Sequence, residues 1–378
     1  MEVGYLEVFN KIWHHCGIEW EDRGPTKTFL TDFVNEISSY GFISGEDILL
    51  CLILGVAFTI LRYLLSTLIF EPFFKWCQLS EKDQKKSPEN AFKFLYYCSA
   101  YGYCSYILFN GKYNFFQDTR NCWKGWYKGM PVSQDIYILY MVQTGFYFHS
   151  MYATVFMDQW RRDSNLMLVH HVIANCLLFF SFAVRYYKIG VIVLFLHDIA
   201  DIFLEFSKLC VAFKSRGGKY HLVPDVLSNV GVSCFALVWL YCRLYLYPLK
   251  VLHSCGCDAR PIVPTAPFYF FFNAMLWVLF LMNIWWFTFI VWLLVRIIIG
   301  KSTGVEDTRE IPEHPEKDKQ LGNGGNVANG EIHEPAGDKA DLMHNGNGIK
   351  RRGENGEHVL HGNEQFRHRQ PHTKPASP

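Results

Sequence analysis

The sequence predicts an all-α integral membrane protein with about seven membrane-spanning helices. Half of the 378 residues are hydrophobic and 17% are aromatic, more apolar surface than one water-soluble domain can cover. This content lies almost entirely before residue 300, in long uninterrupted runs. A soluble globular enzyme is therefore excluded. The formal net charge of +1 also lacks the strongly basic balance that nucleic-acid binding usually needs.

The predicted spans are the stretches that approach the roughly 20 apolar residues needed to cross a bilayer as a helix. They lie at 48–70, 91–109, 135–157, 165–184, 189–213, 224–247 and 268–299. No cleaved signal peptide is expected, because the first long apolar run begins only near Ile48. Residues 1–47 are then a lumenal N-terminal segment, and residues 48–300 form the membrane region.

The final segment, residues 301–378, is predicted to be a disordered cytosolic tail. It contains one aromatic residue, Phe366, and is rich in Gly and Asn, a composition that cannot build a packed core. Seven of the fifteen His lie in it at irregular spacing, which fits no zinc pattern. An odd number of spans places the two ends on opposite sides. Basic residues after the last span, such as Arg296 and Lys301, favour a cytosolic C-terminus.

A stripe of ionisable side chains follows one face of the fifth predicted span. His197 and Asp201 are four positions apart, and Asp198 and Asp201 are three positions apart. Glu205 follows Asp201 by four positions, and Lys208 follows Glu205 by three. At helical spacing these residues share one face. Ionisable groups inside a bilayer are costly unless paired or hydrated. The stripe is therefore expected to face a cavity.

The fourth predicted span carries the pair His170 and His171, the natural partners of that stripe. Buried His and Asp also serve as polar contacts between helices, and Glu205 with Lys208 also suits a snorkelling ion pair. Five such groups on adjacent spans favour a functional site. An imidazole beside a carboxylate can act as a general base or as an acyl acceptor.

The His and Asp side chains of these two spans could instead bind a metal ion, but no metal site is predicted. Membrane di-iron enzymes need about eight His in HxxxH and HxxHH boxes, and the spans and loops before residue 301 hold only eight His in total and no such box. Arg161 and Arg162 precede the His-bearing span. They suit the phosphates of a substrate at the membrane surface, and equally suit ordinary anchoring of a span end.

The run from His170 to Lys208 resembles the Lag motif of the ceramide synthases, which belong to the TLC family. The motif consists of the HH pair followed by HDxxDxxLExxK, here His197 to Lys208. The likeness extends from about Ile48 to Gly300, with the TLC domain at about 91–300. One departure is Ala174, where the family usually has Thr.

The resemblance implies a TLC-type helical barrel around an acyl-chain tunnel, in a multi-pass protein of the endoplasmic reticulum membrane. It implies that fatty acyl-CoA and a sphingoid long-chain base are the substrates and that (dihydro)ceramide is the product. No cofactor is expected beyond acyl-CoA as co-substrate. His170 would be the catalytic histidine and Asp201 its carboxylate partner, with His171, His197 and Asp198 lining the same site.

By the same resemblance, a loop around residues 249–261, between the last two spans, would set the acyl-chain length. Its candidate residues are Leu249, Lys250, Cys255 and Arg260, and the loop resembles that of members preferring stearoyl-CoA. A disulfide of Cys255 or Cys257 with Cys122 or Cys16 stays open, as does a homodimer or a heterodimer with other ceramide synthases. The alternative function is a non-catalytic TLC protein that binds lipid, transports it or assists translocation.

Overall fold

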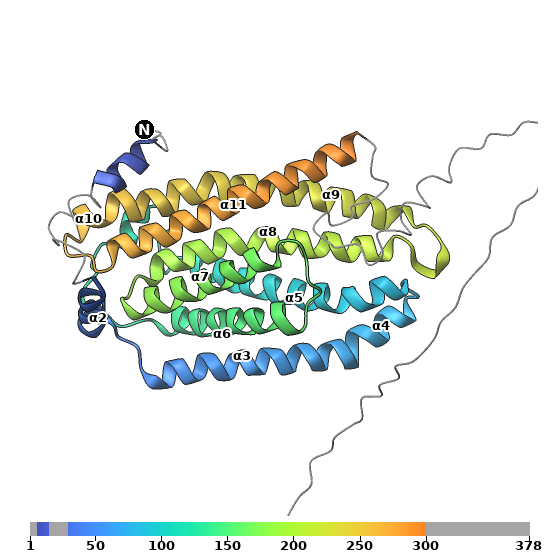
Figure 1. Ribbon diagram of the computed structural model, residues 1–378, viewed down its shortest axis with the longest axis horizontal. Coiled ribbons are helices and arrows are strands. Elements are labelled where there is room, and N and C mark those ends of the chain that lie inside the picture. Colours follow the sequence, from blue (N-terminus) through green and yellow to red (C-terminus); the bar gives the residue numbers. More distant parts are fainter. Residues whose placement is uncertain (1–5, 15–28, 300–378) are drawn as a thin grey trace, which may run out of the picture. The chain divides into compact units, whose positions relative to one another are not determined.

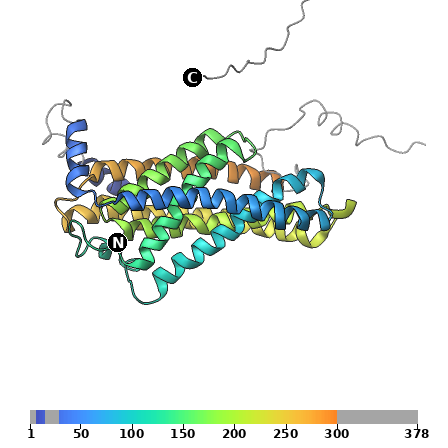
Figure 2. The ribbon, with the colours of Figure 1, turned by 90° about the horizontal axis from the view of Figure 1, so that it is seen from below.

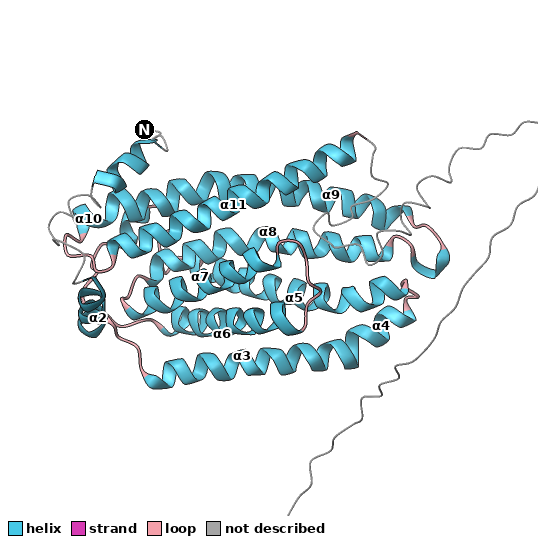
Figure 3. Cartoon of the chain, viewed as in Figure 1, coloured by secondary structure: helices cyan, strands magenta, loops and turns pink. Residues whose placement is uncertain are grey.

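The computed structural model describes residues 6–14 and 29–299. The predicted tail at 301–378 and Cys16 lie outside the described residues. Within those ranges every regular element is a helix, as Figure 3 shows. The predicted all-α class is thereby confirmed for the described part of the chain.

Most of the helices are long, and apart from the segment 110–133 they follow one another with short connections (Figure 1). After α2 (Phe29–Tyr40) come α3 (Gly45–Leu65), α4 (Glu71–Trp76), α5 (Glu81–Phe109), α6 (Gln134–Phe156), α7 (Ser164–Ala183), α8 (Tyr187–Phe213), α9 (Leu222–Val238), α10 (Ala259–Ile262) and α11 (Tyr269–Ile298). The start of α3 is a capping box, in which the Ser44 Oγ accepts from the Asp47 N–H and the Asp47 Oδ2 accepts from the Ser44 N–H, both at 3.1 Å.

Four helical stretches among the described residues are long and apolar enough to cross a membrane. They are Gly45–Trp76, Ser164–Ala183, Leu222–Ile262 and Tyr269–Arg296, which match the first, fourth, sixth and seventh predicted spans. The other three predicted spans coincide with α5, α6 and α8, which carry more polar side chains. The count of seven spans and the barrel stay predictions.

The sixth predicted span does not end at residue 247, and the loop expected at 249–261 is wrong. The helix that begins as α9 continues through wide, π-type turns at Trp239–Leu246, Pro248–Leu252 and Ser254–Asp258 to the end of α10. A proline normally ends a helix, because its ring meets the carbonyl four residues earlier. The i→i+5 spacing of a π-turn opens the helix at that point, and the burial of Val251, Leu252 and Cys255 favours its continuation.

The helices pack as two neighbouring series, α3–α6–α7 and α5–α8–α9, and α11 contacts both α7 and α9 (Figure 2). The contact between α3 and α6 is close because it is made by glycine: a Cβ on Gly145 would lie 2.6 Å from the Leu54 Cβ. Small residues at such crossings let two helix backbones approach.

The connections fall into two groups at opposite ends of the helices. Connections 77–80, 157–163 and 214–221 lie at what we call the cleft end. Connections 110–133, 184–186 and 263–268 lie at what we call the cap end. The two ends differ in chemistry, and this difference determines the candidate site.

Candidate active site

A polar cleft opens among the helices at the cleft end. It borders α5, α6, α7, α8, α9 and α11, and its lining includes nine basic and six acidic side chains. The basic ones are Arg62, Lys82, Lys86, Lys93, Arg161, Lys208, Lys214, Arg243 and Arg296. A cleft with this excess of positive charge suits a polyanionic ligand.

An apolar cavity continues from the cleft toward the cap end. Its walls are mainly aliphatic and aromatic side chains of α7, α8 and α11, including Leu177, Leu194 and Leu276. His170 and Tyr147 line both this cavity and the polar cleft. The pair therefore marks the junction where a polar space meets an apolar one.

His170 projects from α7 into this junction. Its ring lies edge-on to the Trp286 ring, with centroids 5.3 Å apart, and 5.8 Å from the ring of His171. Its Nδ1 is buried and has no hydrogen-bond partner among the described residues. Buried polar atoms are usually paired, and an unpaired one costs free energy. The unpaired Nδ1 of His170 at the junction of the two cavities is therefore a suitable atom for contact with a substrate.

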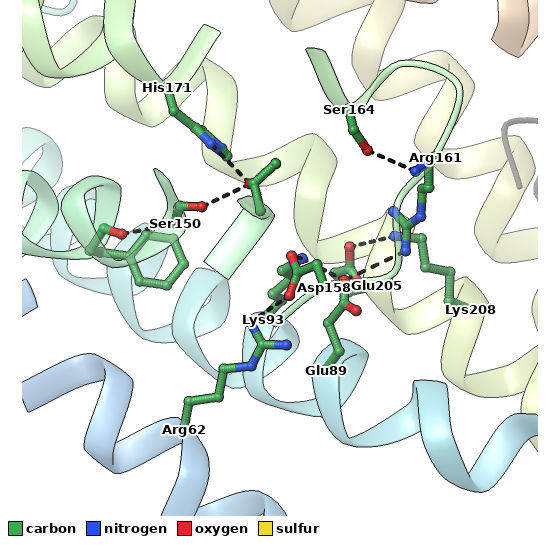
Figure 4. Close-up of polar contacts among 12 residues, drawn as sticks. Arg62, Glu89, Lys93, Ser150, Asp158, Arg161, Ser164, His171, Glu205 and Lys208 are labelled. Carbon is green, nitrogen blue, oxygen red and sulfur yellow. Dashed lines mark hydrogen bonds and ion pairs between the residues drawn. The ribbon is translucent and has the colours of Figure 1, made fainter. Parts of the chain in front are cut away.

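His171, the next residue, is turned toward the polar cleft (Figure 4). Its Nδ1 lies 3.4 Å from the Thr154 Oγ1, and that hydroxyl donates to the Ser150 carbonyl at 2.8 Å. The Thr154 oxygen is therefore the acceptor for a proton on Nδ1 of His171. The His171 ring also stands edge-on to the Tyr147 ring, with centroids 6.0 Å apart.

His197 of α8 lines the apolar cavity, and both of its ring nitrogens have partners. Its Nδ1 donates to the Val193 carbonyl at 2.8 Å, because that carbonyl can only accept. Its Nε2 then accepts from the Asn283 Nδ2 at 3.1 Å. These two bonds fix both the tautomer and the ring orientation, so His197 forms a fixed part of the wall.

Asp198 lies on the predicted stripe but lines neither cavity. Its Oδ2 accepts from the Gln143 Nε2 at 2.8 Å, and the Gln143 Oε1 accepts from the Tyr96 hydroxyl at 2.8 Å. With 1% of its surface exposed, Asp198 belongs to a polar chain that joins α5, α6 and α8.

Asp201 does line the polar cleft, but its partner is not His170 as predicted. Its Oδ2 accepts from the Arg243 guanidinium at 2.8 Å, and the same nitrogen donates to the His197 carbonyl at 2.6 Å. The guanidinium also lies 3.9 Å from the centroid of the Trp239 ring, a cation–π contact. The structure thus adds Arg243, which the sequence analysis missed although it stands alone in an apolar run.

A network of buried ion pairs lies at the wall of the cleft and joins α3 to α5 and to the 157–163 connection (Figure 4). Asp158 forms an ion pair with Arg62, with Oδ1 and Nη1 2.6 Å apart, and its Oδ2 accepts from the Lys93 Nζ at 2.8 Å. Lys93 also donates to Glu89 at 2.6 Å. Burial alone would raise the pKa of the Asp158 carboxyl, but the Lys93 and Arg62 charges outweigh it and hold the pKa well below its usual range. Nothing in the spacing of these residues along the sequence indicates this network.

The two candidate phosphate-binding arginines differ. Arg161 lines the polar cleft, where its guanidinium is 3.5 Å from Glu89, and its backbone N–H donates to the Ser164 Oγ at 2.7 Å. Arg162 is exposed and is not part of the cleft lining. Lys208 and Glu205 form the expected ion pair, at 2.7 Å, and both line the cleft.

Among the predicted chain-length residues, Cys255 lines the apolar cavity, and so does Ala259 nearby. Leu249, Lys250 and Arg260 do not. The Lys250 Nζ donates to the Phe116 carbonyl at 2.7 Å, and the Arg260 guanidinium lies 4.9 Å from the centroid of the Tyr269 ring. Lys250 and Arg260 therefore contact other parts of the chain from outside the cavity.

The described cysteines, including Cys122, Cys255 and Cys257, are free thiols. In residues 6–14 and 29–299, no three His, Cys, Asp or Glu side chains are grouped so as to hold a metal ion.

The TLC domain family model matches residues 86–300. Over 274 residues the chain is 42% identical to Ceramide synthase 1 of Homo sapiens, covering 72% of this chain and 78% of that protein. Ceramide synthase 1 of Mus musculus is equally similar, at 42% identity over 275 residues, with the same coverage of both chains. Ceramide synthase LOH1 of Arabidopsis thaliana is 29% identical over 299 residues, covering 72% of this chain and 93% of the plant protein.

Proposed function

This chain belongs to the ceramide synthase family of TLC-domain proteins, and we propose that it is an acyl-CoA-dependent sphingosine N-acyltransferase. It would transfer a fatty acyl group from acyl-CoA to the amine of sphinganine or sphingosine, which yields (dihydro)ceramide and CoA. One observation carries the proposal: His170 stands where a basic, polar cleft meets an apolar cavity. An acyl-CoA has this same division, a polyanionic head and an apolar chain joined at a thioester.

The substrate is accommodated in two parts. The phosphates of CoA lie among the basic side chains of the cleft, with Arg161 as the arginine that reaches them. The acyl chain fills the apolar cavity along α7, α8 and α11. The thioester carbonyl is then next to His170, at the junction.

The reaction forms one N–C bond and breaks the C–S bond of the thioester. The amine attacks the carbonyl carbon, the CoA thiolate leaves, and the proton lost by the amine ends on the thiolate. His170 serves either as the base that carries this proton or as an acyl acceptor, in which case its ring nitrogen displaces the thiolate first and is then displaced by the amine. A burst of CoA release without sphingoid base would identify the acyl acceptor.

Asp201 is the carboxylate placed to receive the sphingoid ammonium, because it borders the cleft whereas Asp198 does not. Arg243 orients it through the bond to Oδ2. His171 borders the same cleft, and His197 and Asp198 hold the surrounding wall. No cofactor is needed, because the thioester is already activated.

The protein is proposed to lie in the endoplasmic reticulum membrane with the cleft end toward the cytosol, where acyl-CoA is available. Since α11 begins after the 263–268 connection at the cap end, its end and the tail would then be cytosolic. A stearoyl preference rests on the likeness of residues 249–261, where Cys255 and Ala259 border the cavity. Homodimers or heterodimers stay a prediction.

The test is dihydroceramide formation in microsomes that lack endogenous synthases, supplied with sphinganine and a panel of acyl-CoAs. We expect product from the wild type and a loss of at least about a hundredfold in His170→Ala. His221→Ala is the matched control, since the ring Nε2 of that histidine bonds to the Arg216 carbonyl and the residue lines neither cavity. Full activity in His170→Ala would refute the site. Absence of product from well-folded wild type would favour the non-catalytic lipid-binding alternative.

A further inference from the structure

The far end of the apolar cavity is closed by an aromatic side chain from the 110–133 connection. Trp123 follows the short turn Thr119–Cys122, is 4% exposed and lines the cavity. Its neighbours there are Tyr186, from the connection between α7 and α8, and the small residues Cys255 and Ala266. Together they form what we call the cavity floor.

The Trp123 indole is held on two sides. Its Nε1 donates to the Ser254 Oγ at 2.8 Å, and the Ser254 hydroxyl donates to the Thr119 carbonyl at 3.3 Å. Its ring stands edge-on to Tyr186, with centroids 5.1 Å apart. A buried indole with its N–H satisfied is a rigid, bulky group, so a chain that reaches it meets a fixed barrier.

Tyr186 is fixed in turn by its own contacts. Its hydroxyl donates to the Pro267 carbonyl at 3.2 Å, and its ring is 5.3 Å from that of Phe272. The floor is therefore braced from three connections and from α11, and no single helix determines its position.

The distance from the junction to the floor has the scale of a fatty acyl chain. Along α7 the cavity lining extends from His170 to Ser181, which corresponds to about 16 Å at 1.5 Å per residue. On α8 the lining extends from His197 back to Ile189, and Tyr186 follows at the floor. An acyl chain whose carbonyl is at His170 thus ends against Trp123 and Tyr186.

We propose that Trp123 is a specificity-determining residue that stops the acyl chain. This inference rests on the proposed acyltransferase function. Because Trp123 is bonded to Ser254, the 110–133 connection and the 249–261 segment act as one unit in setting the accepted length. The limit on acyl-chain length is thus assigned to Trp123, which lies more than a hundred positions before the segment 249–261 that the sequence predicts to set this length.

The experiment compares kcat/KM across acyl-CoAs of increasing length, in competition, for wild type, Trp123→Ala, Trp123→Phe and Ala266→Leu. Removing the indole is expected to raise the ratio of longer to shorter products about tenfold, the scale on which apolar pockets discriminate by a methylene or two. Trp123→Phe is expected to raise this ratio less. Ala266→Leu adds bulk to the cavity floor and is expected to lower the ratio, in favour of shorter chains.

Trp126→Phe is the matched control. Trp126 belongs to the same connection, donates to the Val184 carbonyl at 3.0 Å and contacts Tyr186, but does not line the cavity. Its profile should stay that of the wild type. An unchanged profile in active Trp123 variants overturns the inference and leaves the acyltransferase intact. If Trp123→Ala fails to fold, the other two variants decide the test: a higher ratio of longer to shorter products in Trp123→Phe and a lower one in Ala266→Leu support the inference, and unchanged ratios overturn it. A wild type without product from any acyl-CoA refutes the proposed function instead.

Discussion

In the polar cleft charged side chains form ion pairs with one another, whereas the apolar cavity is enclosed mainly by packed, uncharged side chains. Asp158 forms ion pairs with both Arg62 and Lys93, and Asp201 forms one with Arg243. The cavity beyond His170 has walls such as Leu177 and Leu276 and a floor that contains Trp123. The same helices, α7, α8 and α11, supply both regions. Substitutions in the cleft that remove a charge but keep the side-chain shape should therefore lower stability or activity. Substitutions in the cavity that exchange one apolar side chain for another of equal size should have little effect.

Arg243 provides the strongest test of this contrast, because it is a buried charge close to the junction. Replacement by Met keeps much of the volume but leaves the Asp201 carboxylate and the His197 carbonyl without their donor. We expect a loss of about 4 kcal/mol in stability, typical of breaking a buried ion pair, together with loss of activity. Thermal unfolding in detergent measures the first effect.

The control for that variant is the double substitution Arg243→Met with Asp201→Asn, which removes the stranded charge. Partial recovery of stability is expected, without recovery of activity. A single Arg243→Met variant as stable as the wild type would mean that the pair contributes nothing to the fold.

Asp158→Asn changes charge within the cleft while preserving shape. It leaves Arg62 and Lys93 without their shared carboxylate, and a loss of about 3 kcal/mol is expected. Because pairing lowers the folded-state pKa of Asp158, its stabilising effect is fully present above the usual carboxyl pKa of about 4 and is lost as pH falls toward the folded value.

The corresponding measurement is the difference in stability between wild type and Asp158→Asn from pH 7 down to pH 3. The difference should be constant at the upper end and shrink below about pH 4. A difference that grows on acidification would contradict the assigned direction of the pKa shift.

Arg161→Ala probes the mouth of the cleft, with Arg162→Ala as its neighbour and control. Loss of one phosphate-binding guanidinium should raise KM for acyl-CoA about tenfold and leave kcat nearly unchanged, as for an interaction made equally in ground and transition states. Arg162 lies outside the lining, so its variant should behave as wild type. Equal effects of both substitutions would indicate general surface charge as the cause.

Leu276→Met represents the cavity side of the comparison and the smallest expected effect. Leu276 is buried and lines the apolar cavity. A volume-conserving apolar exchange usually costs less than about 1.5 kcal/mol, and activity should be retained. If this variant proved as damaging as Asp158→Asn, the distinction between a paired cleft and a shaped cavity would fail.

The sequence predicts the helices and the polar stripe well, because both follow from local periodicity and composition. Asp201 and Glu205 do face a cavity, and His170 lies at its junction. The partners were not predictable in the same way. Whether Asp201 contacts His170 or Arg243 depends on how two helices are rotated about their axes, which spacing within one helix does not encode. Asp198, on the same stripe, is turned toward Gln143 of α6 for that reason.

Two further misses have different physical origins. Pro248 indicates a helix end by its local chemistry, yet wide turns and the burial of the following residues continue the helix. Arg62 is a charged residue inside the first predicted span, and only tertiary packing reveals that its partner is Asp158. In both cases long-range packing overrides or completes a local signal.

The wide turns between Trp239 and Asp258 have a consequence for how this segment can diverge. A π-turn contains one residue more than an α-turn, so the segment can gain or lose single residues while remaining helical. A single-residue insertion or deletion that is absorbed by such a turn leaves the side chains beyond it in place, whereas one in a regular α-helix would rotate them by about 100°. This segment can therefore change in length while Cys255 keeps its position beside the cavity floor.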